Sequence, residues 1–325
     1  MYNNFSDFLK DKGRICVIQA ENPDGDSLGS ALALEELLKD KEVSLFCPVN
    51  IPPYLRYFEG WGRVNDEFPT DVDGYIIVDT AADILLSKVL EDLAARDALE
   101  NKPVFVIDHH ETEDDLSFSH EAIIETLPSC TNLIYKIAKD QNIEVSKLAA
   151  ELLLQGLTSD TLGFTVSGVD ADTFRTAAEL LEYGADIAEL DEKRREFMKK
   201  SQRILGYKAD LIKRIEYHLD GNLATVHIPW EDIEEYSNEY NPGVLILDEM
   251  RMVEGVKIAV AIKTYPDGRV TGKLRSSVPI SEEVAGYFGG GGHPYAAGFR
   301  TYDTDYNGVV KDLIKCVYPL LELDD

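Results

Sequence analysis

The sequence predicts an α/β protein in which a parallel-sheet N-terminal domain is joined by a helical linker to a smaller α/β C-terminal domain. A length of 325 residues suggests two domains, at about 150 residues each. In the first half, short apolar runs alternate with helical patterns, as expected for a parallel sheet covered by helices. The last third is richer in strands, and a charged segment separates the two parts. We expect domains at 1–185 and 215–325, with 186–214 as the linker.

The elements of the first domain follow from short runs rich in β-branched and aromatic residues, which are typical of buried strands. We expect a helix at 5–10 and strands at 14–19, 43–47, 74–78 and 104–107. An Ala/Leu-rich helix ends near residue 39, and further helical patterns cover 82–99, 148–157 and 174–183. A turn at Ser129 precedes an amphipathic helix that ends near Asp140, and Gly184 is a helix stop.

The second half begins with a charged pattern at 186–212, which predicts one long connecting helix. Strands are expected at 223–228, 244–249, 256–263 and 272–274. The Asp267-Gly268 pair predicts a hairpin turn. A loop of four glycines, 289–292, precedes the last helix at about 306–320.

The composition limits the classes of partner. The net charge is −28, with 60 acidic against 32 basic residues, which disfavours duplex nucleic acid because phosphate contacts supply most nonspecific affinity. The acidity is equally well explained by solubility or a saline habitat. No apolar run reaches the roughly 18 residues of a membrane span, and the N-terminus has no signal-peptide core. The 4 cysteines lack metal or disulfide spacing, so we expect a cytoplasmic protein with reduced thiols.

Acidic side chains follow the predicted strands and apolar segments. They are Asp24, Asp26, Asp79 and Asp160, and His109 belongs to the same set. The carboxyl ends of parallel strands meet at one edge of a sheet, so these residues are expected to converge. Carboxylate and imidazole ligands suit Mn²⁺ or Mg²⁺, and two such ions clamp a phosphoryl oxygen and activate a water. The alternative is that they are solvated loop residues.

The C-terminal half carries a second candidate site. Backbone N–H groups of a glycine-rich loop bind phosphate in other proteins, and Arg275 offers a bidentate partner. The alternatives are a flexible hairpin tip and a plain surface arginine. The candidate substrate-binding residues are Arg275, Ser276, Gly290, Gly291, Gly292 and His293.

The motifs together resemble the DHH phosphoesterases with a DHH-associated C-terminal domain, in the nanoRNase and 3′-phosphoadenosine-5′-phosphate (pAp) phosphatase branch. The motifs are NPDGD at 22–26, VDT at 78–80, DHH at 108–110, TSDT at 158–161 and the closing GGGGHPYAAGF. The resemblance covers essentially the whole chain, and the DHH triplet and the glycine-rich motif are specific together.

The resemblance implies a two-ion Mn²⁺ site, with Mg²⁺ as an alternative, and the catalytic triplet Asp108, His109 and His110. Asp24 and a bridging Asp79 would serve the first ion. The second ion would be held by Asp26, Asp79, His109 and Asp160. Implied substrates are short single-stranded oligonucleotides, dinucleotides such as pApA, and pAp. The sequence does not determine the oligomeric state, and a homodimer is one alternative.

One position departs from the family pattern. The family has a histidine four residues before the first aspartate, and this chain has Ala20. A methyl group cannot ligate a metal, so we expect a weakened first ion and reduced hydrolysis. Natural drift and deliberate inactivation both explain the alanine. The leading hypothesis is a metal-dependent phosphoesterase, and the alternative is a nucleotide-binding sensor of the same fold. An inorganic pyrophosphatase is disfavoured by the closing glycine-rich motif.

Overall fold

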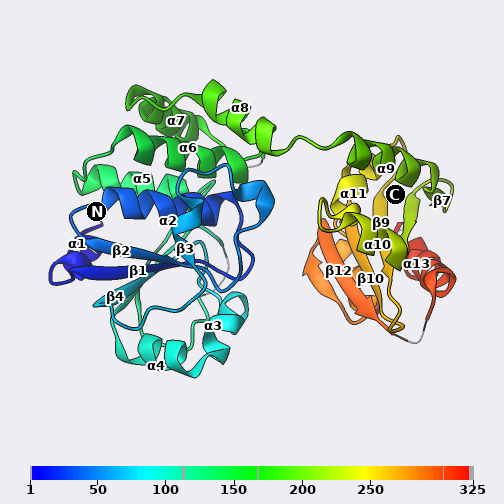
Figure 1. Cartoon of the computed structure of the whole chain (residues 1–325), viewed down its shortest axis with the longest axis horizontal. Coiled ribbons are helices and arrows are strands. Elements are labelled where there is room, and N and C mark those ends of the chain that lie inside the picture. The colour runs from blue at the N-terminus through cyan, green and yellow to red at the C-terminus, as the bar shows by residue number, and fades with distance from the viewer. Residues whose placement is uncertain (1, 112–113, 167, 303, 322–325) are drawn as a thin grey trace. The chain divides into compact units, whose positions relative to one another are not determined.

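The structure is a computed structural model that describes residues 2–111, 114–166, 168–302 and 304–321. The chain divides into two compact units, Met1–Lys199 and Lys200–Asp325 (Figure 1). Each unit has a six-stranded sheet with helices packed against it. The α/β fold class is therefore confirmed, whereas the exact domain and linker bounds stay predictions.

The sheet of the first unit is parallel throughout its pairings and has the order β3-β2-β1-β4-β5-β6. Its strands are β1 (Arg14–Ile18), β2 (Glu42–Phe46), β3 (Val64–Asn65), β4 (Gly74–Val78), β5 (Val104–Asp108) and β6 (Glu121–Ile124). The strand order reverses between β1 and β4, and such switch points are where open α/β sheets bind ligands. Asp24 and Asp26 follow β1, and Asp79 follows β4.

Helices cover both faces of this sheet (Figure 1). One apolar core contains side chains of α1 (Asn3–Leu9), α2 (Gly25–Leu37), α5 (Cys130–Asp140), α6 (Lys147–Asp160), α7 (Ala171–Glu182) and α8 (Ile187–Phe197). The other core contains side chains of α3 (Ser87–Glu91) and α4 (Leu93–Asn101). Short 3₁₀ turns lie at η1 (Pro53–Leu55), η2 (Trp61–Arg63) and η3 (Asp83–Leu86). Helix α2 lies against α5 and α6, so most of its residues, Asp26 among them, are buried.

The second unit has a mixed sheet with the order β11-β12-β10-β9-β8-β7, in which only β8 and β9 pair in parallel. The strands are β7 (Glu216–His218), β8 (Leu223–Ile228), β9 (Ile258–Thr264), β10 (Val270–Ser276), β11 (Gly291–His293) and β12 (Ala296–Thr301). Its helices are α9 (Gln202–Lys213), α10 (Trp230–Tyr236), α11 (Pro242–Arg251), α12 (Ser281–Tyr287) and α13 (Tyr306–Leu321). One core lies on the side of α12 and α13, and another lies on the side of α9, α10 and α11.

Three predicted elements were wrong. The run at 244–249 is part of α11, because Asn241 caps the helix and Pro242 occupies its first turn. The segment 186–212 is two helices, since the hydroxyl of Ser201 accepts a hydrogen bond from the N–H of Ile204 and starts α9. The predicted glycine loop includes a short strand, β11, that pairs with β12. Among the described residues, no helix is long and apolar enough to cross a bilayer.

Candidate metal centre

Asp26 is the most deeply buried acid of the predicted set, at 1 % exposure. It lies in the first turn of α2 and points at the start of α5. The N–H of Cys130 donates to its Oδ2, while the N–H and hydroxyl of Thr131 donate to its Oδ1 at 3.1 and 2.7 Å. Free N–H groups and the helix dipole favour an anion at a helix N-terminus. The α5 N-terminus therefore holds this carboxylate in one orientation.

His109 presents one ring nitrogen to the acids. Its Nδ1 lies 2.8 Å from the carbonyl oxygen of Leu127, which can only accept, so Nδ1 carries the proton and Nε2 has a free lone pair. This Nε2 is 3.3 Å from Oδ1 of Asp79, 3.5 Å from Oδ2 of Asp160 and 3.7 Å from Oδ2 of Asp26. Acids from after β1, after β4 and from the end of α6 thus meet one imidazole. Four of the five residues that the sequence predicted to converge therefore lie together, and Asp24 is not one of them.

The three carboxylates are crowded and poorly solvated. Burial raises the pKa of Asp26 and of Asp79, and the negative charge of Asp26 raises the pKa of Asp79 further. Burial, with the charge of Asp26, raises the pKa of Asp160 to about 6. The Oδ1 atom of Asp79 is buried and has no hydrogen-bond partner within the described part of the chain. Such a site is electrostatically costly unless a cation balances it.

The residue types present fit a divalent cation. Ligand atoms of Asp26, His109 and Asp160 lie within 4.8 Å of one another, as do those of Asp79, His109 and His110. Both groups share His109. Its Nδ1 proton is hydrogen-bonded to the backbone carbonyl of Leu127, on the side away from the acids, as is common for metal-binding histidines. Carboxylate oxygens with one imidazole suit Mn²⁺ or Mg²⁺. The structure therefore supports a divalent-metal site at these residues.

Asp108 and His110 form a pair beside these ligands. Oδ1 of Asp108 accepts hydrogen bonds from the N–H of His109 and from Nδ1 of His110, at 2.8 and 2.7 Å. Burial alone would raise the pKa of Asp108, but the hydrogen bond and charge of His110, together with the N–H and charge of His109, lower this pKa. The same hydrogen bond raises the pKa of His110. Asp108 therefore orients the imidazole of His110, whose side chain is 45 % exposed.

Asp24 and Ala20 lie at the edge of the centre. Oδ1 of Asp24 accepts from the N–H groups of Asp26 and Ser27, which caps α2. Asp24 belongs to neither ligand group, although its charge raises the pKa of Asp26 and Asp79. Ala20 is buried after β1, at 7 % exposure, and contributes no polar side-chain atom. The role of Asp24 at a first ion stays a prediction.

In the second unit, the register aligns two predicted phosphate-binding positions. Ala296 of β12 pairs with Arg275 on one side and with His293 on the other. Nη1 of Arg275 donates to the carbonyl of Leu274, and no ion pair involves this arginine among the residues the structure describes. The hydroxyl of Ser276 is buried and bonds to the carbonyl of Val278 at 2.6 Å. The substrate-binding roles of these residues stay predictions.

Two of the glycines are required by sterics. A β-carbon at Gly290 would lie 2.2 Å from the carbonyl oxygen of Gly298, and one at Gly292 would lie 2.7 Å from that of Ala296. Gly292 also has a φ of +144°, which other residues rarely adopt. Gly291 lies between them with open space around it. The hairpin therefore needs Gly290 and Gly292 for its own geometry, and Gly291 leaves backbone accessible.

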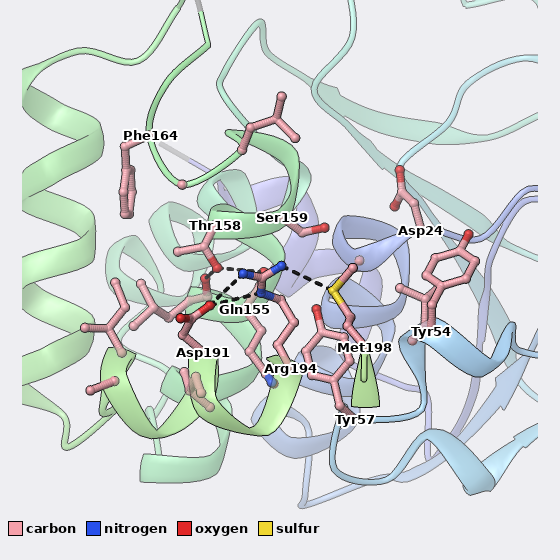
Figure 2. Close-up of a pocket in the computed structure, with 18 residues that line it drawn as sticks. Asp24, Tyr54, Tyr57, Gln155, Thr158, Ser159, Phe164, Asp191, Arg194 and Met198 are labelled. Atoms are coloured by element: carbon pink, nitrogen blue, oxygen red, sulfur yellow. Dashed lines mark hydrogen bonds and ion pairs between the residues drawn. The ribbon is translucent and has the colours of Figure 1, made fainter. Parts of the chain in front are cut away.

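The sequence did not identify a large cavity in the first unit, of about 740 Å³, that adjoins Asp24 (Figure 2). Its labelled walls include Tyr54, Gln155, Phe164 and Arg194. These residues come from η1, α6, the loop after α6 and α8. No local motif marks them, because only the tertiary fold brings them together.

Comparisons with known proteins match part of the first unit to a family and most of the chain to curated relatives. Residues 14–157 match the DHH family, N-terminal domain. The bifunctional oligoribonuclease and PAP phosphatase NrnA of Thermus thermophilus is 28% identical over 313 residues, covering 94% of this chain and 90% of the relative. The protein of the same description from Bacillus subtilis is 23% identical, covering 87% and 88%.

More distant relatives match as well. A probable manganese-dependent inorganic pyrophosphatase from Bacillus cereus is 28% identical over 212 residues, covering 54% of this chain and 62% of the relative. The crystal structure of an exopolyphosphatase-related protein from Bacteroides fragilis superposes with a TM-score of 0.84 at 22% identity, covering 98% and 97% of the two chains, and shows the same fold. Residues 14–157 thus match the DHH family N-terminal domain, and the chain over most of its length is similar to the oligoribonuclease and PAP phosphatase proteins, as its motifs had indicated.

Proposed function

We propose that this chain is a metal-dependent phosphoesterase that hydrolyses short oligonucleotides, pAp or both. The observation that carries the proposal is the approach of Asp26, Asp79 and Asp160 to the unprotonated Nε2 of His109, within 3.7 Å. The similarity to the oligoribonuclease and PAP phosphatase proteins supports the substrate class. The similarity to a manganese-dependent pyrophosphatase supports Mn²⁺ as the ion.

The contacts of each residue indicate its role. Asp26, Asp79, His109 and Asp160 would hold the ions, and Asp24 would complete a first site. Divalent ions in such a site polarise a phosphoryl oxygen and lower the pKa of a water. The N-terminus of α5 keeps Asp26 oriented. The carbonyl of Leu127 accepts a hydrogen bond from Nδ1 of His109, which holds His109 in the tautomer with a free Nε2. These fixed contacts reduce the reorganisation needed when a substrate binds.

His110 would act on the substrate itself. Asp108 fixes its Nδ1 proton, which leaves Nε2 as the exchangeable position on a partly exposed ring. A protonated imidazole there stabilises charge on the phosphate or donates a proton to the leaving oxygen. Asp108 is then a positioning residue, because its contacts are to His109 and His110. The predicted catalytic triplet would thus combine one orienting acid, one metal ligand and one group that faces the substrate.

In the second unit, Arg275 and the Gly291 backbone would bind phosphate groups of the nucleotide. The shared register with Ala296 places Arg275 and His293 on strands that flank the same strand. Arginine pairs bidentately with phosphate, and backbone N–H groups add further donors. Ser276 would act by positioning Arg275 rather than by direct contact, since its hydroxyl bonds within the protein.

The alternative is a nucleotide-binding sensor of the same fold, and Ala20 is the observation that favours it. The two functions are separated by an assay of the chain with Mn²⁺ on pApA and on pAp, together with equilibrium binding of the same nucleotides. Hydrolysis by the wild-type protein that is lost in Asp160→Asn supports the phosphoesterase function. Binding without hydrolysis, in wild type as in Asp160→Asn, supports the sensor and contradicts the enzyme.

A further inference from the structure

The cavity beside Asp24 is lined mainly by apolar and aromatic side chains, together with a smaller number of polar and charged ones. It has a volume of about 740 Å³ and is lined by Tyr54, Tyr57, Phe164, Leu162 and Met198 among others. Pockets for small organic ligands are about 300–1,000 Å³ and have this kind of lining with a few polar groups. Figure 2 shows Tyr54 and Asp24 at one side of the cavity and Phe164 at the other. The cavity therefore extends from the edge of the metal centre into an apolar space.

Tyr54 is the aromatic residue next to the metal centre. Its side chain is 55 % exposed although it lies in an apolar wall. Tyr54 and Asp24 both line the cavity, and Figure 2 shows them on the same side of it. A base stacked on an exposed aromatic ring gains affinity without demanding one sequence. Tyr54 thus offers a stacking surface beside a candidate metal ligand.

Gln155 supplies a polar group without a protein partner. It is 5 % exposed, and its side-chain amide makes no hydrogen bond to the residues described in the structure. The amide atoms are not fully buried, so their hydrogen bonds are left to water or to a ligand that completes them. A carboxamide donates and accepts at once, as the edge of a nucleobase does.

The charges in the cavity argue against a second phosphate there. The guanidinium of Arg194 already bonds to Asp191 through Nε and Nη2, at 3.1 and 2.7 Å. Its Nη1 lies 3.4 Å from the sulfur of Met198. The lining carries two negative charges, on Asp24 and Asp191, against one positive charge, on Arg194. The cavity therefore suits an uncharged, flat group better than an anion.

We infer that this cavity binds the nucleoside part of the substrate whose phosphate is held at the metal centre. Tyr54 stacks on the base, and Gln155 hydrogen-bonds to its edge. The inference rests on the proposed function and adds to it a base-binding site within the first unit. It identifies Tyr54 and Gln155 as residues that determine specificity for nucleotides over other phosphoesters.

The test compares two probes that share a phosphate and differ in the base, adenosine 5′-monophosphate and ribose 5-phosphate. Calorimetric titrations use the full chain with Mn²⁺. Wild type is expected to bind the nucleotide about tenfold more tightly, the scale of one base–aromatic stack. Tyr54→Ala should lose most of this preference, and Ala188→Phe, which adds a ring to the wall of the cavity, should do the same. Both should bind ribose 5-phosphate as wild type does.

The control is Tyr183→Ala, which removes a similarly exposed tyrosine, at 46 %, that does not line the cavity. It should keep the preference of wild type. Equal affinities of wild type for both probes would overturn the inference, as would a preference that survives in Tyr54→Ala and Ala188→Phe. Hydrolysis of pApA is measured on the same preparations. A protein that prefers the nucleotide but hydrolyses nothing contradicts the proposed function and leaves the base site supported.

Discussion

Gly156 on α6 faces the carboxylate of Asp26 so closely that a β-carbon at Gly156 would lie 3.0 Å from its Oδ1 atom. The same β-carbon would lie 2.4 Å from Cγ2 of Thr131, whose hydroxyl donates to Asp26. The glycine therefore sets how near α6 comes to α2, and with it the place of the buried acid. Close packing of α2 on α6 is a condition for the metal centre.

The variant Gly156→Ala tests this relationship. We expect it to weaken Mn²⁺ binding about tenfold or more and to cost about 1–3 kcal/mol of stability, because overpacking displaces Asp26 and Thr131. The control is Gly206→Ala in α9, where an added β-carbon meets nothing within 4 Å. That change should leave Mn²⁺ binding intact and stabilise by about 0.5–1 kcal/mol through helix propensity. Titration calorimetry and urea unfolding measure both; unaltered Mn²⁺ affinity in Gly156→Ala contradicts the expectation.

Asp160→Asn should separate metal binding from folding. In the metal-free protein, the pKa of Asp160 is raised from 3.8 to about 6, so the folded state holds the proton longer than the unfolded state. Its contribution to stability therefore falls as the pH rises from about 4 to about 6, and the penalty is complete above that window. Metal-free Asp160→Asn should be more stable than wild type at pH 7, with a smaller difference at pH 4.5.

The same variant should lose the stabilisation that Mn²⁺ confers. A ligand present at about 100 times its dissociation constant stabilises by about 2.7 kcal/mol, and Asp160→Asn should show little of this. Denaturant unfolding in the presence of Mn²⁺ and in the presence of EDTA gives the free energy of unfolding with and without the ion. A metal-free variant less stable than wild type at pH 7 would show that Asp160 is paired structurally rather than left for a cation.

Ala20→His should strengthen the first ion site. The imidazole adds a ligand after β1, and we expect Mn²⁺ affinity and hydrolysis of pApA to rise about tenfold, equivalent to about 1.4 kcal/mol. Ala20→Leu controls for bulk at this buried position, since it fills space without a nitrogen, and it should give no gain. The Mn²⁺ content of each variant after dialysis and the initial rate of pApA hydrolysis test this expectation. Unchanged stoichiometry and rate in Ala20→His would show that the alanine is not what limits the site.

Arg275→Ala should weaken binding of pAp by about tenfold to a hundredfold, because a charge-assisted contact to phosphate is worth about 1.5–3 kcal/mol. Its effect should shrink at high salt. Arg251→Ala removes an exposed arginine at the end of α11 and serves as the charge control. Fluorescence or calorimetric titration at low and high salt measures both variants. Equal losses in the two variants would mean that general charge, rather than a specific contact, is responsible.

The predictable part of the site is the part that follows a sheet edge. Asp79 and His109 come directly after β4 and β5, and Asp26 follows β1 in the first turn of the next helix, so parallel pairing was enough to expect them together. Asp160 was foreseen as an acid beside an apolar helix. The hydrogen-bond partners that orient these groups were not foreseen: the Thr131 hydroxyl, which donates to Asp26, and the Leu127 carbonyl, which accepts from His109, act through tertiary contacts that no sequence spacing indicates.

The errors in the fold have local causes. An apolar run of about six residues is compatible with a strand or a helix, and at 244–249 the capping signal of Asn241-Pro242 decided for the helix. The charged stretch at 186–212 lacks a glycine or proline where it breaks, so Ser201 as a helix cap was the only local sign. The cavity lined by Tyr54 and Gln155 could not be predicted from the sequence, because it depends on how η1, α6 and α8 pack.

The four apolar cores have a consequence for how the protein melts. Among the described residues, two lie within residues 2–190 and two within 204–321, so each unit has apolar cores of its own. Each unit should then lose its structure as a separate cooperative block, and a scanning calorimeter should record two endotherms. Mn²⁺ should move only the endotherm of the first unit to higher temperature, so the heat trace by itself would reveal where the ion resides.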